Sequence, residues 1–304
     1  MTGAWPEIPL DGWDDTYQTL QLWTQMPGKT RLALSPAQNH YWHVALYVTS
    51  RGIGTSPIPY GPRTFEVDFD FLDHRLAVRA SDGKTASLPL EPRTVAEFCE
   101  RYLALLRSLD IEARIRKVPC EVANPIPFLE DTTHRSYDRG AVERWFRALL
   151  RADRVLKELR GAFLGKASPV HFWWGAFDLA STRFSGRKAP RHPGGVPGLP
   201  DAVAVESYSH ECASAGFWPG NRGGPVEEAA FYAYAYPEPA GFADAKLGVE
   251  AARYDATLKE WLLPYEAVRR APDGDALLRA FVGGAYDAAA RLGAWDPALQ
   301  RSGR

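Results

Sequence analysis

The sequence predicts an α+β protein made of two related halves, each an antiparallel sheet packed with helices, arranged about a pseudo-twofold axis by internal duplication. Alternating apolar and polar stretches, typical of half-buried antiparallel strands, occur in both halves between amphipathic helical segments. A series of short motifs also occurs twice in one order: Gly-Lys, Ser-Pro, His-aromatic-Trp, a His ending a strand, and Leu-Pro-x-Glu. The copies run from Gly28 to Glu91 and from Gly165 to Glu266. Unrelated halves would seldom share five landmarks, so the series indicates duplication.

The first half, residues 1–117, is expected to run from a helix through several strands to a second helix. The first helix is predicted over 13–26, because apolar side chains lie near one face and Pro27-Gly28 follows. Strands are predicted over 31–34, 41–49, 65–71, 76–80 and 88–90. Thr94 and Glu97 form a capping box, which indicates where the closing helix begins.

The second half, residues 140–304, follows a proline-rich connector over 118–139. Helices are predicted over 140–163 and 275–292, and strands over 171–182, 202–212, 231–236 and 260–263. In a regular strand over 202–212, Glu206, Tyr208 and His210 would share one face. Pro/Gly-rich insertions at 185–200, 217–225 and 237–248 lengthen this half, and such loops often serve as lids or binding loops.

Charge and composition narrow the classes of protein to consider. The net charge of −1 arises from 36 basic and 37 acidic residues among 304, so we expect neither a nucleic-acid nor a membrane partner. The segment Met1–Leu10 lacks the features of a signal peptide and no window has the ~20 apolar residues of a membrane span, which favours a cytoplasmic protein. Three cysteines without a CxxC pair do not indicate a disulfide framework. The oligomeric state stays open.

Several long strings resemble a bacterial protein family of unknown function, DUF5996. They are TQMPGKTRLAL, NHYWHVALYVTSRG, SPVHFWWGAFDLASTRFSGRKAP, ESYSHE, AGFWPG and FYAYAYPEP. The resemblance extends from Trp5 to Asp296. It implies no activity, so a function has to be argued from the residues.

Six of the seven histidines lie in or next to the repeated motifs and these strings, and histidine transfers protons near neutral pH. They are His40, His43, His74, His171, His192 and His210. We expect His210 and Glu211 to act as acid and base and His171 to position the substrate. A metal-dependent enzyme is the first alternative, with His171, His210 and Glu211 as ligands, joined by Asp178 or His43. No HExxH or other local ligand spacing supports it, so the cofactor stays unknown.

Basic residues cluster where the predicted strands end, which favours a small anionic ligand, because Arg and Lys match carboxylate or phosphate groups. The substrate-binding candidates are Lys166, Arg183, Arg187, Lys29, Arg51, His43 and Trp173. The leading hypothesis is an enzyme acting on a small anionic metabolite in a cleft between or beside the halves. A non-catalytic ligand-binding or scaffold protein is the second alternative.

Overall fold

The computed structural model describes residues 4–196 and 198–300 and contains two antiparallel sheets of six strands each. Residues 1–3 of the N-terminal segment, residue 197 of the first inserted loop and the last four residues lie outside this description. The α+β class is confirmed. Within the described residues, none of the helices has the length and hydrophobicity needed to cross a bilayer.

The first sheet has the strand order β1-β2-β4-β5-β6, with β3 paired to β4. Its half contains α1 (Asp14–Leu34), the 3-10 segment η1 (Asn39–Val44), β1 (Tyr47–Val48), β2 (Gly52–Gly54), β3 (Ile58–Tyr60), β4 (Arg63–Asp70), β5 (Arg75–Ala80), β6 (Thr85–Pro89) and α2 (Val95–Ser108). Phe69 of β4 stacks on Phe98 of α2 at a centroid distance of 6.4 Å, and Phe98 stacks on Trp23 of α1 at 4.3 Å. The predicted cap of α2 is confirmed, because the Thr94 side chain accepts a hydrogen bond from the backbone of Glu97.

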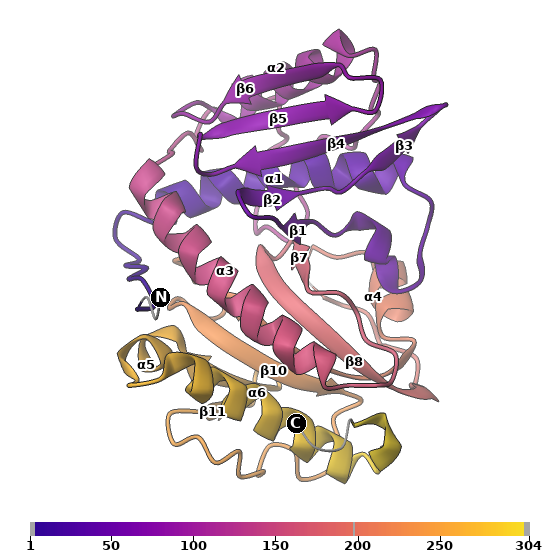
Figure 1. Ribbon diagram of the computed structural model, residues 1–304, viewed down its shortest axis with the longest axis vertical. Coiled ribbons are helices and arrows are strands. Elements are labelled where there is room, and N and C mark those ends of the chain that lie inside the picture. The colour runs from indigo at the N-terminus through magenta and orange to yellow at the C-terminus, as the bar shows by residue number, and fades with distance from the viewer. Residues whose placement is uncertain (1–3, 197, 301–304) are drawn as a thin grey trace.

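The second sheet has the strand order β7-β8-β9-β10-β12-β11. Its half contains α3 (Arg139–Gly161), β7 (His171–Trp173), β8 (Asp178–Lys188), α4 (Asp201–Ser207), β9 (His210–Trp218), β10 (Ala230–Tyr236), β11 (Arg253–Asp255), β12 (Glu260–Pro264), α5 (Tyr265–Arg270), α6 (Gly274–Leu292) and the 3-10 turn η2 (Pro297–Leu299). Helices α3 and α6 lie across one face of this sheet (Figure 1). Phe231 and Ala233 of β10 are buried in the core, so the alternate residues Tyr232 and Tyr234 lie on the opposite face.

The two halves share one hydrophobic core. Trp145 of α3 is fully buried, and its ring lies 5.5 Å from Phe71 of the first half and 5.9 Å from Phe172 of the second. The backbone of Leu46 also exchanges two hydrogen bonds with Phe172, at 2.9 and 2.8 Å. The N-terminal segment of the first half also contacts the second half, because the ring of Trp5 packs edge-on against that of Tyr265 at a centroid distance of 5.7 Å.

Three of the predicted strands are wrong in whole or in part, because residues 31–34 and 201–207 are α-helical and residues 41–44 belong to the 3-10 segment η1. Helix α1 continues through Pro27 to Leu34, so residues 31–34 are helix rather than strand. Almost every residue of α1 from Thr16 to Arg31 is buried, and this packing outweighs the backbone hydrogen bond that proline removes. Residues 201–207 form α4, because Pro200 and Asp201 provide an N-terminal helix signal. Glu206, Tyr208 and His210 therefore do not share the face of one strand.

The proposed duplication is not confirmed. Gly28-Lys29 lies inside a helix, whereas Gly165-Lys166 lies in the loop after α3. The His-aromatic-Trp motif forms the 3-10 segment η1 in the first half and strand β7 in the second. Repeated motifs therefore adopt different structures, although each half is an antiparallel sheet with helices.

Candidate functional site

Five side chains from both halves meet where the halves adjoin. They are His40 and Trp42 of η1, Lys166 before β7, Phe184 of β8 and His210 at the start of β9, and we call them the seam site. Nζ of Lys166 lies 2.7 Å from Nε2 of His40. The ring of His40 stacks on Phe184 at 4.5 Å and meets the ring of His210 edge-on at 5.8 Å. The structure thus brings the predicted residues Lys166 and His210 together around a histidine of the first half.

Lys166 supplies the positive charge of the seam site. Its Nζ lies 5.3 Å from the ring centroid of Trp42 and 5.1 Å from that of Phe184. Desolvation between these rings lowers its pKa, although the residue as a whole is exposed. In the described part of the chain no carboxylate forms an ion pair with it. An arriving anion would therefore meet a cation that has no internal counter-ion.

His40 is held as a neutral imidazole of defined tautomer. Because the ammonium of Lys166 can only donate, Nε2 of His40 accepts, and Nδ1 then donates to the carbonyl of Ser207 at 3.0 Å. Burial lowers the pKa of His40, and the nearby Lys166 and His210 lower it further. His40 and Tyr41 both have left-handed backbone conformations, with φ of 58° and 57°. Such conformations are costly for residues other than glycine and cluster at functional sites.

Glu211 and Arg187 form a network of their own. The carboxylate of Glu211 accepts hydrogen bonds from Ser185 Oγ and from Arg187 Nε, both at 2.8 Å. Arg187 also donates to the carbonyl of Ala294 at 2.9 Å, just beyond the C-terminal end of α6. Both partners are thus occupied in holding β8 and β9 against that helix end, where a cation is favoured.

His171 and Trp173 lie on β7 behind the seam site. The ring of His171 is buried to 99% and lies 5.7 Å from Trp42 and 5.0 Å from Trp173. Burial lowers the pKa of His171 to about 3, so the imidazole is neutral throughout the physiological range. His210 is half-buried, and its Nδ1 lies 3.1 Å from Ser209 Oγ.

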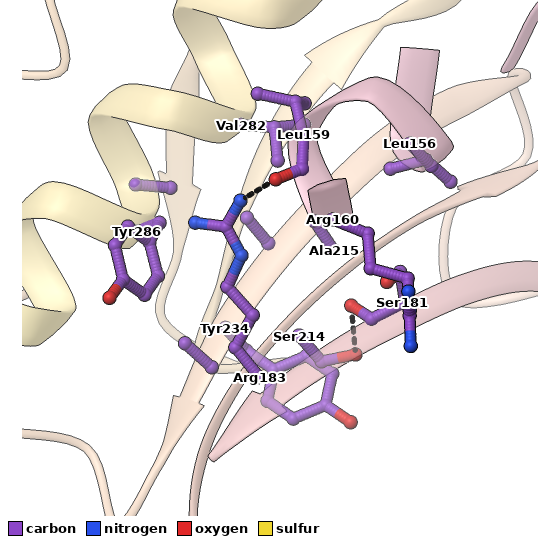
Figure 2. Close-up of a pocket in the computed structure, with 13 residues that line it drawn as sticks. Leu156, Leu159, Arg160, Ser181, Arg183, Ser214, Ala215, Tyr234, Val282 and Tyr286 are labelled. Atoms are coloured by element: carbon purple, nitrogen blue, oxygen red, sulfur yellow. Dashed lines mark hydrogen bonds between the residues drawn. The ribbon is translucent and has the colours of Figure 1, made fainter. Parts of the chain in front are cut away.

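Arg183 lies on the other face of the second sheet, within a pocket between α3, α6 and the strands (Figure 2). Its guanidinium donates to the carbonyl of Leu159 and lies 4.2 Å from the ring of Tyr286. The cavity volume is about 30 Å³, which accommodates water but not a metabolite. The sheet therefore separates Arg183 from the seam site.

Three further predicted ligand residues lie elsewhere. Arg51 pairs with Asp70 and Asp73 in the first sheet. Lys29 is buried inside α1, with Nζ 5.5 Å from the ring of Trp174. His43 is buried in η1, where its Nδ1 accepts a hydrogen bond from the backbone of Gln38 at 3.2 Å.

No metal centre is apparent in residues 4–196 and 198–300, because no three His, Cys, Asp or Glu side chains are grouped closely enough to hold an ion. The predicted metal ligands His171 and Glu211 also have different surroundings. The ring nitrogens of His171 are buried, whereas Glu211 is engaged by Arg187 and Ser185.

A second group of ionisable side chains, the carboxyl cluster, lies on the face of the second sheet away from α3 and α6. It consists of Glu121 of the connector, Asp178 of β8 and Glu260 of β12. Burial raises the pKa of these three carboxyls to about 7, 6 and 8, and the charge of Asp178 raises the pKa of the other two further. The hydroxyl of Tyr232 donates to Asp178.

The sequence indicated only Asp178 of this cluster, as a possible metal ligand. The three carboxyls come from segments far apart in the chain, and no local spacing connects them. The one local signal is Gly175, where a Cβ would lie 2.0 Å from Oε1 of Glu121. A glycine that admits a carboxylate can be recognised only once the fold is known.

Comparisons with known proteins identify the family but not an activity. Neither the curated proteins nor the solved structures contain a significant match to the chain. A family model does match, and it covers residues 5–302, nearly the whole chain. The chain therefore belongs to the family of unknown function DUF5996.

Proposed function

We propose that the protein is an enzyme that binds a small anionic metabolite at the seam site and uses the histidines there for acid–base chemistry. One observation carries the proposal: the amine of Lys166 donates to a neutral His40 at 2.7 Å, with no neutralising carboxylate among the described side chains. Charge-assisted hydrogen bonds to an anion are strong in such partly desolvated surroundings.

The same contact supports a route for a proton. When Lys166 turns toward a bound anion, Nε2 of His40 becomes free to accept a proton from the ligand. The carbonyl of Ser207 continues to accept from Nδ1, so it orients the ring and stabilises the imidazolium that forms. His210 stands 5.8 Å from His40, centroid to centroid, as a second proton-transfer group. General acid–base catalysis by positioned side chains typically contributes about 10²–10⁴-fold in rate.

Replacing Lys166 by methionine is expected to weaken anion binding at least tenfold, on the order of the free energy of one charge-assisted hydrogen bond. Calorimetric titration with phosphate, sulfate and small carboxylates measures the dissociation constants. Lys246→Met is the matched control, because Lys246 is an exposed lysine outside the seam site. The proposal fails if none of these anions binds or raises the melting temperature, or if Lys166→Met binds them as the natural protein does.

Anion binding is also expected to be accompanied by proton uptake at His40. His40 has a pKa below its ordinary value of 6.5 in the free protein, and a negative charge beside it favours the protonated form. The pKa therefore rises on binding, and protons are taken up between the two values. Calorimetry in buffers of different ionisation enthalpy measures the number of protons. In His40→Gln the binding should remain and the uptake should decrease; unchanged uptake would assign the proton to another group.

A further inference from the structure

His171 lies beneath three aromatic side chains that are all half-buried. The ring centroids of Trp42, Tyr47 and Trp173 lie 5.7, 5.5 and 5.0 Å from that of His171, and each ring meets the imidazole edge-on. We call these four residues the aromatic box. Two of its walls come from the first half of the chain and the third comes from β7.

Neither ring nitrogen of His171 has a hydrogen-bond partner in the described chain, although both are buried. Leaving buried polar atoms unpaired is costly, and such atoms in a native protein call for an explanation. A neutral imidazole has one N–H donor and one acceptor nitrogen, and a bare nitrogen in the ring of a ligand would accept a hydrogen bond from that N–H. The low pKa of His171 means that it cannot relieve this cost by taking up a proton at neutral pH.

A second incompletely paired side chain lies behind the same box. Arg31 is buried, its guanidinium lies 5.4 Å from the ring of Tyr47, and its Nε also lacks a partner within the described residues. Two separate buried groups are therefore incompletely paired on one side of these aromatic rings.

The aromatic box is continuous with the seam site through Trp42. The indole of Trp42 lies 5.5 Å from His40, 5.3 Å from Nζ of Lys166 and 5.7 Å from His171. The indole of Trp42 thus lies between the ammonium group of Lys166 and the unpaired imidazole of His171. A ligand with an acidic group at one end and a flat ring at the other would match both.

We propose that the ligand of the seam site is a planar heteroaromatic acid, whose acidic group binds Lys166 and whose ring enters the aromatic box and hydrogen-bonds to His171. This inference rests on the proposed anion-binding function and specifies its substrate class. Because the nitrogens of His171 are covered, the ring has to displace the indole of Trp42, which is carried by the 3-10 segment with two left-handed residues. The displaced indole and the rings of Tyr47 and Trp173 then enclose the ligand ring by stacking.

Three probes of equal charge test the inference: pyridine-3-carboxylate, benzoate and cyclohexanecarboxylate. We expect pyridine-3-carboxylate to bind at least tenfold more tightly than cyclohexanecarboxylate, with benzoate between them. Calorimetry measures the affinities, and the change in tryptophan fluorescence reports whether Trp42 moves. Trp42→Leu should remove both the fluorescence change and the preference for aromatic rings.

His171→Phe separates the hydrogen bond from the packing. It keeps an aromatic ring at the site but removes both unpaired nitrogens, so we expect a higher melting temperature together with loss of the preference for pyridine-3-carboxylate over benzoate. A lower melting temperature with the preference intact would assign His171 a purely structural role and overturn the inference. Equal, Lys166-dependent binding of all three acids by the natural protein would overturn it while leaving the proposed function standing. If none of the acids binds, both fail.

Discussion

Replacing Trp145 by alanine is expected to lower the free energy of unfolding by about 3–5 kcal/mol, the usual cost of removing a large aromatic side chain from a core. The ring stacks on Trp13 and Phe177 at 5.6 and 5.0 Å and meets Phe71 and Phe172 edge-on. These neighbours come from both halves of the chain, so one cavity would weaken both halves. Denaturant unfolding followed by circular dichroism and by fluorescence measures the loss.

Trp145→Phe is the matched control. It preserves much of the stacking and removes the indole nitrogen, which is buried without a hydrogen bond in the described structure. We expect it to retain most of the stability. In both variants the two probes should report one transition, because the halves share this core. Two separate transitions, one of them unaffected by the substitution, would instead support independent domains divided near residues 118–139.

Local periodicity predicted the elements whose pattern agrees with their burial. Strand β4 alternates buried Phe65, Val67 and Phe69 with acidic residues, and α3 and α6 carry buried apolar residues at helical spacing. Helix α1 could not be delimited in this way, because it is buried on nearly all sides and contains polar residues such as Thr24 and Gln25. The side chain of Gln25 bonds to the backbone of Cys120 in the connector, a partner about a hundred residues away.

The seam site shows the corresponding limit for function. Basic residues and histidines in the motif segments indicated Lys166 and His210. The role of His40 depends on Ser207 at the end of α4, a segment that the sequence had predicted to be a strand. Contacts between residues 40, 166 and 207 are set by the packing of the halves, which no local pattern encodes.

Between pH 6.5 and pH 9 the protein is expected to lose stability, on the order of 2 kcal/mol, because of the carboxyl cluster. The pKa values of Glu121 and Glu260 are raised to about 7 and 8, so the folded state binds more protons than the unfolded state in this range. Stability that is fully present below the ordinary carboxyl pKa is therefore lost as the pH rises through the folded values. His171, His40 and His43 have lowered pKa values and act in the opposite direction, but only below pH 6.5. The change in stability between pH 6.5 and pH 9 therefore reports the carboxyls and not these three histidines.

Glu260→Gln assigns the effect to one side chain. An amide of the same shape cannot ionise, so the variant should be more stable than the natural protein at pH 9 and lose less stability between pH 6.5 and 9. Denaturant unfolding at four or five pH values measures both quantities, and Glu250→Gln, at an exposed position, is the control. If the natural protein showed a flat profile, or if Glu260→Gln kept the full slope, the carboxyl of Glu260 would have to be ionised in the folded protein at neutral pH. Retention of a destabilising carboxyl is typical of sites selected for function rather than for stability, so a confirmed slope would make the carboxyl cluster the next place to look for chemistry.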